Sequence, residues 1–330
     1  AVEGVPLEAV WLFQAVFAGT AATIVAGAVA ERMKFVAYLG YAFLLSAFIY
    51  PVVGHWVWGG GWLANLNFHD VAGSTVVHGV GGMAALVGAW LLGPRIGRFG
   101  KDGAPHVIAG HNMPLVGMGV FILWFGWFGF NAGSTLGFDE PEVVARVAIN
   151  TMLSPSIGAI AAMFTAWVWW GKPDLTVALN GALAGLVGIT APCAVVSPSA
   201  SLFIGLIAGI LVVFGIDWMN RIRVDDPVGA VPVHGLCGIW GTLAVGLFGQ
   251  QALGSPSNGL LYGGGFGQLG IQCLGVIACY AFAGIAMFLV FKVIDVTLGL
   301  RVSKETELRG LDLDEHGMES YAGFQIFTTE

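Results

Sequence analysis

Two histidines occupy matching positions in two similar segments of the chain. The first segment runs Asp70-Val-Ala-Gly-Ser-Thr-Val-Val-His78, and the second runs Asp226-Pro-Val-Gly-Ala-Val-Pro-Val-His234. Glycines one and four positions beyond each histidine coincide as well. Because imidazole can ligate a metal, exchange a proton or form hydrogen bonds on two sides, the repeat predicts a site built from His78 and His234.

Three kinds of chemistry fit such a pair: two axial ligands of a haem, part of a metal site, or a hydrogen-bonded pair that lines a pore. A haem needs a large cavity, and a transition metal needs a third or fourth ligand at the same depth. Only Cys237 lies near in sequence, three residues after His234. The four cysteines (Cys193, Cys237, Cys273 and Cys279) form no CxxC pattern, so they predict neither structural zinc nor a disulfide framework. The pattern favours the pore-lining pair, with no metal and no cofactor.

The composition indicates that these residues lie in a membrane. Hydrophobic residues make up 57% of the 330 positions, and charged residues make up only 10%, against a usual share of about 25%. A soluble domain could not cover its surface with so few charges, so we expect an integral membrane protein. The 13 lysines and arginines form no basic stripe, which excludes nucleic-acid binding.

Nine apolar runs are long enough to cross a bilayer core of about 30 Å as helices. They cover residues 8–30, 36–58, 71–94, 113–131, 142–171, 174–192, 200–220, 226–249 and 266–298. The runs lack the alternating polarity of β-barrel strands. All basic residues except Arg146 then fall on one side, so the positive-inside rule places the N-terminus outside and the C-terminus inside. We expect a transmembrane domain over residues 1–298 and a cytoplasmic tail over 299–330.

In this topology the two histidine segments enter the membrane from opposite faces, which is typical of an inverted repeat with a transport site at the midplane. Eight residues of helix rise about 12 Å, so both histidines are expected at mid-depth. The second histidine helix closes a five-helix unit, whereas only two spans precede the first one. The repeat therefore predicts two further helices before residue 1, giving an inverted-repeat bundle of eleven.

Asp70 and Asp226 are expected at helix N-termini, where a carboxylate caps free backbone N–H groups. This structural role is sufficient for Asp226. For Asp70, on the outer side above His78, a functional role stays open: it could orient the pore mouth or assist proton removal from a cation.

Aromatic residues gather at the outer ends of three spans. Phe13 and Phe17 share one face of the first span, and Trp127 and Phe130 lie at the outer end of the fourth. The tryptophans of the second span are Trp56, Trp58 and Trp62, of which Trp56 and Trp62 fit an interfacial belt. We expect fewer aromatics at the inner ends. Aromatic faces attract small cations by about 0.5–2 kcal/mol, so the sequence predicts a narrow pore for a small cation or its neutral conjugate base.

These motifs together resemble the ammonium transporter family (Amt/MEP/Rh). The resemblance extends over nearly the whole chain and includes Phe13-Gln-Ala-Val-Phe17-Ala-Gly, Gly27-Ala-Val-Ala-Glu-Arg32, Trp58-Gly-Gly-Gly, Gly126-Trp-Phe-Gly-Phe-Asn-Ala-Gly-Ser134, Val224-Asp-Asp-Pro and Gly310-Leu-Asp-Leu-Asp-Glu-His-Gly317. It implies eleven membrane helices per subunit, a homotrimer with one pore per subunit, and location in the cell membrane. Trp58 with Ser134 favours the Amt branch.

The resemblance also implies roles for individual residues. Phe17, Trp58 and Ser134 would recruit ammonium outside, Phe17 and Phe130 would form the gate, and Trp127, His78 and His234 would line the pore. Asp70 would support the recruitment site and take part in deprotonation.

The implied activity is transport of ammonium or ammonia, which is not an enzymatic reaction. An ammonium sensor with a signalling domain elsewhere is the alternative. The similarity of the tail to the tail of this family implies that the trimeric nitrogen-regulatory signal protein of the P-II class docks there.

Overall fold

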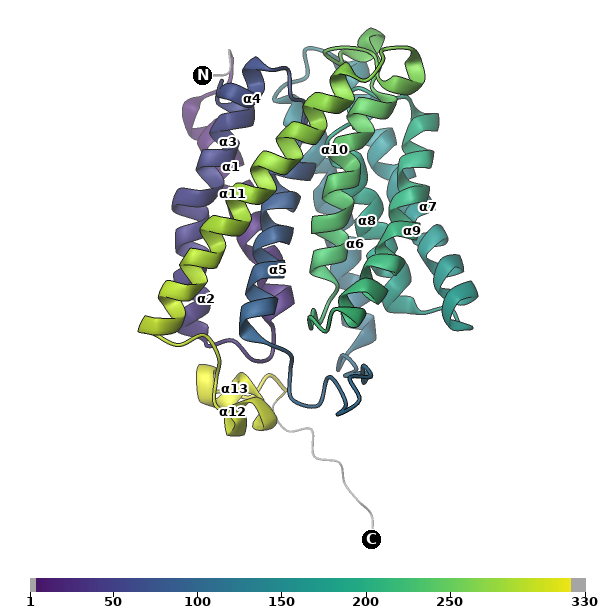
Figure 1. Cartoon of the computed structure of the whole chain (residues 1–330). Helices are drawn as coiled ribbons and strands as arrows, with labels where there is room; N and C mark the ends of the chain where they lie inside the picture. Colours follow the sequence, from purple (N-terminus) through teal and green to yellow (C-terminus); the bar gives the residue numbers. More distant parts are fainter. Residues whose placement is uncertain (1–3, 322–330) are drawn as a thin grey trace.

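The computed structural model describes residues 4–321, and within that range every regular element is a helix or a helical turn. The helices stand roughly side by side, with two short helices of the tail below one end of the bundle (Figure 1). Basic residues such as Arg32, Arg95 and Arg301 lie at this same end, which is the inner end of the predicted topology. The fold is therefore an all-helical bundle of the kind that the apolar runs predict.

Of the first three spans, the first is one continuous helix, and the second and third each include a π-turn. They comprise α1 (Leu7–Val29), α2 (Phe35–Leu44), the π-turn η1 (Leu45–Ile49), α3 (Tyr50–Trp58), the short α4 (Trp62–Asn65), the π-turn η2 (Ser74–Gly79) and α5 (Val80–Leu92). The π-turn η2 runs directly into α5, so the first histidine segment enters the membrane as a π-turn followed by an α-helix.

The remaining spans are mostly continuous helices, and the span of the second histidine segment again includes a π-turn. They comprise α6 (Met113–Asn131) with the 3₁₀ turn η3 (Ala132–Thr135), α7 (Pro141–Trp170), α8 (Leu175–Thr190), α9 (Pro198–Arg221), the π-turn η4 (Val231–Leu236) with α10 (Cys237–Phe248), the 3₁₀ turns η5 (Gln251–Leu253) and η6 (Leu260–Tyr262), and α11 (Gly267–Thr297). The π-turns η2 and η4 occupy equivalent places in the two segments of the repeat.

All nine predicted runs are helical. Eight of them correspond to helices that are long and apolar enough to cross a membrane, and the sixth, α8, has 16 residues. Side-chain caps fix several starts: Asn112, Asp174 and Ser197 accept backbone N–H groups at the beginnings of α6, α8 and α9.

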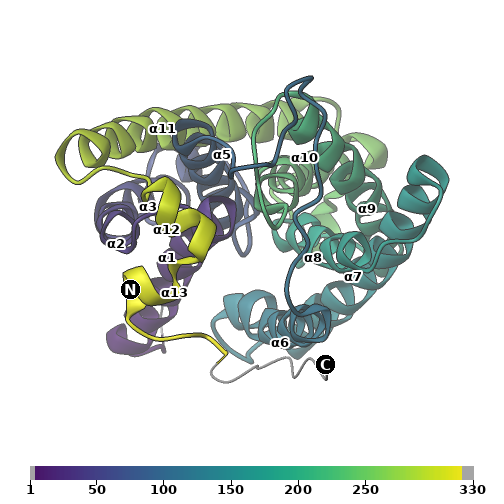
Figure 2. The same cartoon turned by 90° about the horizontal axis from the view of Figure 1, so that it is seen from below.

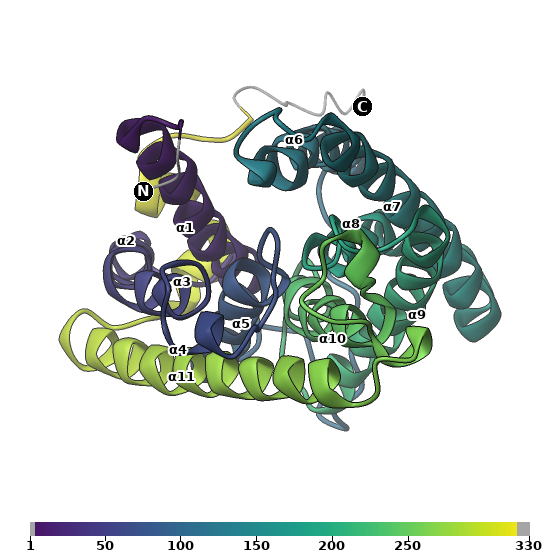
Figure 3. The same cartoon turned by 90° about the horizontal axis from the view of Figure 1, so that it is seen from above.

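Seen from its two ends, the bundle has two groups of helices with α11 lying across both. Figures 2 and 3 show α1, α2, α3 and α5 on one side, α6 to α10 on the other, and α11 beside α5 and α10. Within the second group, glycines allow backbones to touch: a Cβ on Gly158 would lie 2.5 Å from the Gly181 carbonyl oxygen. No hydrophobic effect drives helices together in lipid, so close packing of this kind supplies the attraction between them.

The inner end is held by a network of charges around Asp225. Arg95 Nε lies 2.8 Å and Arg98 Nε 3.2 Å from its carboxylate, and the fully buried Arg32 donates to its backbone carbonyl at 2.8 Å. Burial by itself raises the pKa of Asp225, but the hydrogen bonds from Arg95 outweigh it and hold the pKa below its ordinary value. This carboxylate therefore stays ionised and ties the α5–α6 loop to the start of the second histidine segment.

The first part of the tail is helical. It contains α12 (Lys304–Arg309) and α13 (Leu311–His316), and side chains of both helices contact the inner end of the bundle. Glu315 accepts the Phe35 N–H at the start of α2, because that helix terminus has free donors. Residues 322–330 of the tail lie outside the described range.

Aromatic residues are not scarce at the inner ends of the spans, contrary to the expectation from the sequence. Trp167, Trp169 and Trp170 are exposed at the inner end of α7, next to Lys172. Aromatic belts form at both membrane interfaces, so an excess on the outer side cannot by itself indicate a binding site.

Candidate functional site

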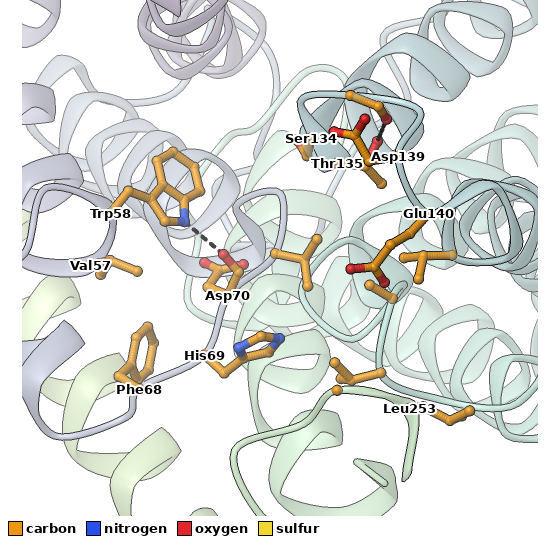
Figure 4. A pocket seen from close by; sticks show the side chains of 16 residues that line it. Val57, Trp58, Phe68, His69, Asp70, Ser134, Thr135, Asp139, Glu140 and Leu253 are labelled. Atoms are coloured by element: carbon orange, nitrogen blue, oxygen red, sulfur yellow. Dashed lines mark hydrogen bonds between the residues drawn. The ribbon is translucent and has the colours of Figure 1, made fainter. Parts of the chain in front are cut away.

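A cavity of about 510 Å³ opens at the outer end of the bundle. Trp58, Asp70 and Ser134 contribute to its wall, and Figure 4 shows Trp58 beside Asp70, with Ser134 on another segment. Asp139 and Glu140 lie farther along the same wall. The cavity therefore joins residues from α3, the loop before η2, and the turn after α6.

Hydrogen bonds fix the polar groups of this mouth. Trp58 Nε1 donates to the Asp70 backbone carbonyl at 2.7 Å, which holds the indole ring at the end of α3. Ser134 Oγ donates to the Phe130 carbonyl at 2.7 Å. Because the hydroxyl proton is used in this way, the oxygen lone pairs remain able to accept an N–H donor.

Two phenyl rings lie directly next to the mouth. Phe17 and Phe130 stack with centroids 4.1 Å apart, and Phe17 meets Trp58 edge-on at 6.1 Å. The Phe17 side chain is only 2% exposed. The two rings lie between the mouth and the first histidine, since Phe17 contacts Trp58 and Phe130 contacts His78.

Beyond the rings, the two histidines come together as the repeat predicts. His78 Nδ1 and His234 Nδ1 are 3.1 Å apart, and His78 also stacks on Trp127 and on Phe130 with centroids 5.1 Å and 5.4 Å away. A hydrogen bond at this distance requires one Nδ1 to carry a proton and the other to accept it. The Nε2 atom of His78 is buried and has no partner among the described residues.

Both histidines stand on π-turns, and the aspartates cap those turns. Asp70 accepts four backbone N–H groups, from Gly73 and Ser74 on one oxygen and from Thr75 and Val76 on the other, at 2.8–3.0 Å. Asp226 accepts Gly229 and Val231 in the same way. Each Asp70 oxygen is therefore already engaged, and the geometry gives Asp70 the capping role that the sequence assigns to both aspartates.

Some contributors to the site carry no sequence signal. Trp127 Nε1 donates to Thr190 on α8, and Thr75 and Thr242 share a hydrogen bond of 2.6 Å between the two histidine helices. Gln272 on α11 pairs with both backbone groups of His69. Thr190, Thr242 and Gln272 belong to no quoted motif, and only their contacts reveal them. Within the described part of the chain, no three His, Cys, Asp or Glu side chains converge as metal ligands.

Comparisons with known proteins identify the family of the chain. The model of the Ammonium Transporter Family matches residues 2–321. The chain is 47% identical to ammonium transporter Amt2 of Archaeoglobus fulgidus over 97% of its own length and 71% of that protein. A putative ammonium transporter of Synechocystis sp. is also 47% identical, over 96% of this chain and 70% of that protein.

Solved structures extend the likeness to the fold. A sensor Amt protein superimposes with a TM-score of 0.85 at 40% identity, covering 91% of this chain and 75% of its own. A mutant of Candida albicans Mep2 gives a TM-score of 0.84 at 29% identity, covering 92% of this chain and 68% of its own. The chain therefore belongs to the ammonium transporter family and is a multi-pass membrane protein.

Proposed function

We propose that this protein recruits ammonium at the outer mouth, removes one proton, and conducts ammonia past the paired histidines. The observation that carries the proposal is the order of groups along one path. Aromatic faces and a hydroxyl acceptor come first, two stacked phenyl rings follow, and a hydrogen-bonded histidine pair comes last. Each group suits one step in handling a small cation that has a neutral conjugate base.

Recruitment rests on Phe17, Trp58 and Ser134. The faces of the two rings attract a cation by about 0.5–2 kcal/mol. The Ser134 oxygen can accept one N–H of ammonium, because its own proton points to the Phe130 carbonyl. No carboxylate oxygen of Asp70 is needed for this contact, and Asp70 supports the site by fixing Trp58 through its carbonyl.

Deprotonation follows from the cost of burying charge, and water in the outer cavity takes the proton as ammonia leaves the mouth. Moving an unpaired ion from water into a medium of low dielectric constant costs on the order of tens of kcal/mol by Born solvation. The residues next in line are Phe17, Phe130, Trp127 and the histidines, which bring no negative charge. Ammonia avoids most of this cost, so the gate formed by Phe17 and Phe130 passes the neutral species and rejects bare alkali cations.

The histidine pair then offers a donor and an acceptor to the passing molecule. With one proton shared between the Nδ1 atoms, one Nε2 carries a proton and the other presents a lone pair. The buried Nε2 of His78, which has no protein partner in the described structure, is available for ammonia. The same pair can relay a proton, which would make transport electrogenic.

Uptake of labelled methylammonium tests the proposal. The complete reading frame should restore growth on low ammonium and accumulate the label in a host that lacks its own ammonium transporters. Absence of uptake from a well-expressed, folded protein would contradict the proposal and favour the sensor alternative. One observation favours the sensor alternative: one of the similar solved structures is a sensor Amt protein.

The proposal also includes assembly into an oligomer and regulation through the tail. We infer a homotrimer from the family resemblance, with residues 299–330 as a cytoplasmic tail. The docking of α12 and α13 against the inner face supports a regulatory tail, and Glu307 connects it to the α5–α6 loop by accepting the Ile96 N–H at 2.7 Å. A P-II class signal protein that binds there would act beside the pore exit.

A further inference from the structure

A tyrosine on α11 contacts the π-turn that carries His234. Tyr280 Oη donates to the carbonyl of Gly235, the residue after His234, at 2.6 Å. The tyrosine hydroxyl thus supplies a donor to the backbone at the point where the π-turn passes into α10.

The hydroxyl reaches this place because two glycines leave space for it. A Cβ on Gly79, at the end of η2, would lie 2.5 Å from Tyr280 Cε2 and 2.8 Å from Oη. A Cβ on Gly238, in α10, would lie 3.0 Å from Oη. The phenol end therefore sits between the two histidine helices and touches both.

The helix that carries Tyr280 lies outside the two matching segments. Figure 3 shows α11 running across α5 and α10. Two turns before Tyr280, Gln272 accepts the His69 N–H at 2.9 Å and donates to the His69 carbonyl at 2.7 Å. Residues eight apart lie near one face of a helix. One face of α11 thus holds both the loop before the first histidine helix and the π-turn of the second.

We propose that Tyr280 is a positioning residue that sets the place of His234 in the pore by holding the Gly235 carbonyl. The inference rests on the proposed function of the histidine pair and adds a residue to it. A π-turn in a helix leaves backbone groups without their usual partners and persists where something else satisfies them. The tyrosine hydroxyl supplies that partner.

Loss of the Tyr280 hydroxyl should therefore lengthen or break the hydrogen bond between the two histidines. The Nδ1 atoms are 3.1 Å apart, near the long end of the range for a hydrogen bond between nitrogen atoms, so a shift of about 0.5 Å breaks it. Without its partner, the Gly235 carbonyl favours regular α-helical bonding, which turns His234 away from His78. The change is local because the phenyl ring still fills the space between the helices.

The test compares Tyr280→Phe with the wild-type protein, His234→Ala and the double variant in proteoliposomes. Tyr41→Phe is the matched control, since Tyr41 is buried and its hydroxyl faces a carbonyl, that of Ala22 at 3.5 Å, on the α1–α2 contact. We expect Tyr280→Phe to lower the initial rate of methylammonium uptake at least fivefold and to raise potassium leak. The double variant should be no worse than His234→Ala, because both changes act on the same ring.

A second readout separates this inference from the proposed function. With ¹⁵N-labelled histidine, the wild-type protein should give the signature of an Nδ1–Nδ1 hydrogen bond, which Tyr280→Phe should abolish and Tyr41→Phe should keep. This spectrum does not depend on transport. If Tyr280→Phe fails to fold, Gly79→Ala, which pushes the phenol away, should show the same loss. A preserved histidine signal, uptake within twofold of wild type, or effects that add to those of His234→Ala would overturn the proposal.

Discussion

Replacing Asp70 by asparagine separates a capping role from a chemical one. The carboxylate accepts four backbone N–H groups, two on each oxygen. An asparagine amide retains one oxygen and turns an NH₂ group toward two of those donors, so two charge-assisted hydrogen bonds are lost. At about 1.5–3 kcal/mol for each bond to a charged group, the change should destabilise the folded protein by about 3–6 kcal/mol.

The assay pairs thermal unfolding of the purified variant with methylammonium uptake. Asp70→Asn should lower the Tm by several degrees and reduce uptake severely, because the cap sets the start of the His78 helix and the Asp70 carbonyl holds Trp58. Asp226→Asn is the control with the same cap but no place at the outer mouth, and it should lose stability as well. An unchanged Tm with uptake abolished would refute the capping account and indicate direct proton transfer by Asp70.

Three further outcomes follow from other parts of the structure. Trp58→Leu removes a cation–π partner worth about 0.5–2 kcal/mol, so the apparent KM for methylammonium should rise about 2- to 30-fold with a smaller change in maximal rate; an unchanged KM would remove Trp58 from recruitment. The pKa of Asp225 is lowered in the folded state, so its ionised form stabilises the protein above the ordinary carboxyl pKa, and this gain disappears as pH falls through the folded pKa. Unfolding curves of wild type and Asp225→Asn should therefore differ at pH 7 and converge below about pH 4, whereas a constant difference would contradict the assignment. A chain that ends at Leu300 should lose P-II class protein in a pull-down that the intact chain retains, and binding by the shortened chain would exclude the tail.

The sequence predicts the membrane spans well, because a long apolar run has only one stable form in lipid. Predicted and observed starts differ most at the two histidine segments. The predicted runs begin there at 71 and 226, but the helices begin at Ser74 and Val231. There the chain first forms a capped loop, and the aspartate bonds to N–H groups of the following π-turn. Hydropathy alone cannot distinguish that loop from helix.

The candidate site follows from the repeat only in part. Pairing of His78 with His234 could be predicted, since an inverted repeat brings equivalent residues to one axis. Tyr280 and Gln272 could not, because α11 has no counterpart in the repeat and carries no motif around them. The contact of Glu315 with the Phe35 N–H likewise joins segments far apart in sequence, and nothing local to either residue indicates it.

The central claim is that the histidine pair passes a neutral molecule and excludes bare cations. The most direct measurement is ion flux through proteoliposomes that contain wild type, His78→Ala or His234→Ala, with ammonium and potassium supplied in turn. Each alanine variant leaves a cavity large enough for water or a bare cation and removes a hydrogen-bonding partner of ammonia, so ammonium flux should persist at a reduced rate while potassium begins to pass. If both variants keep the wild-type proton coupling and still exclude potassium, the histidines only pack the bundle and the account is wrong.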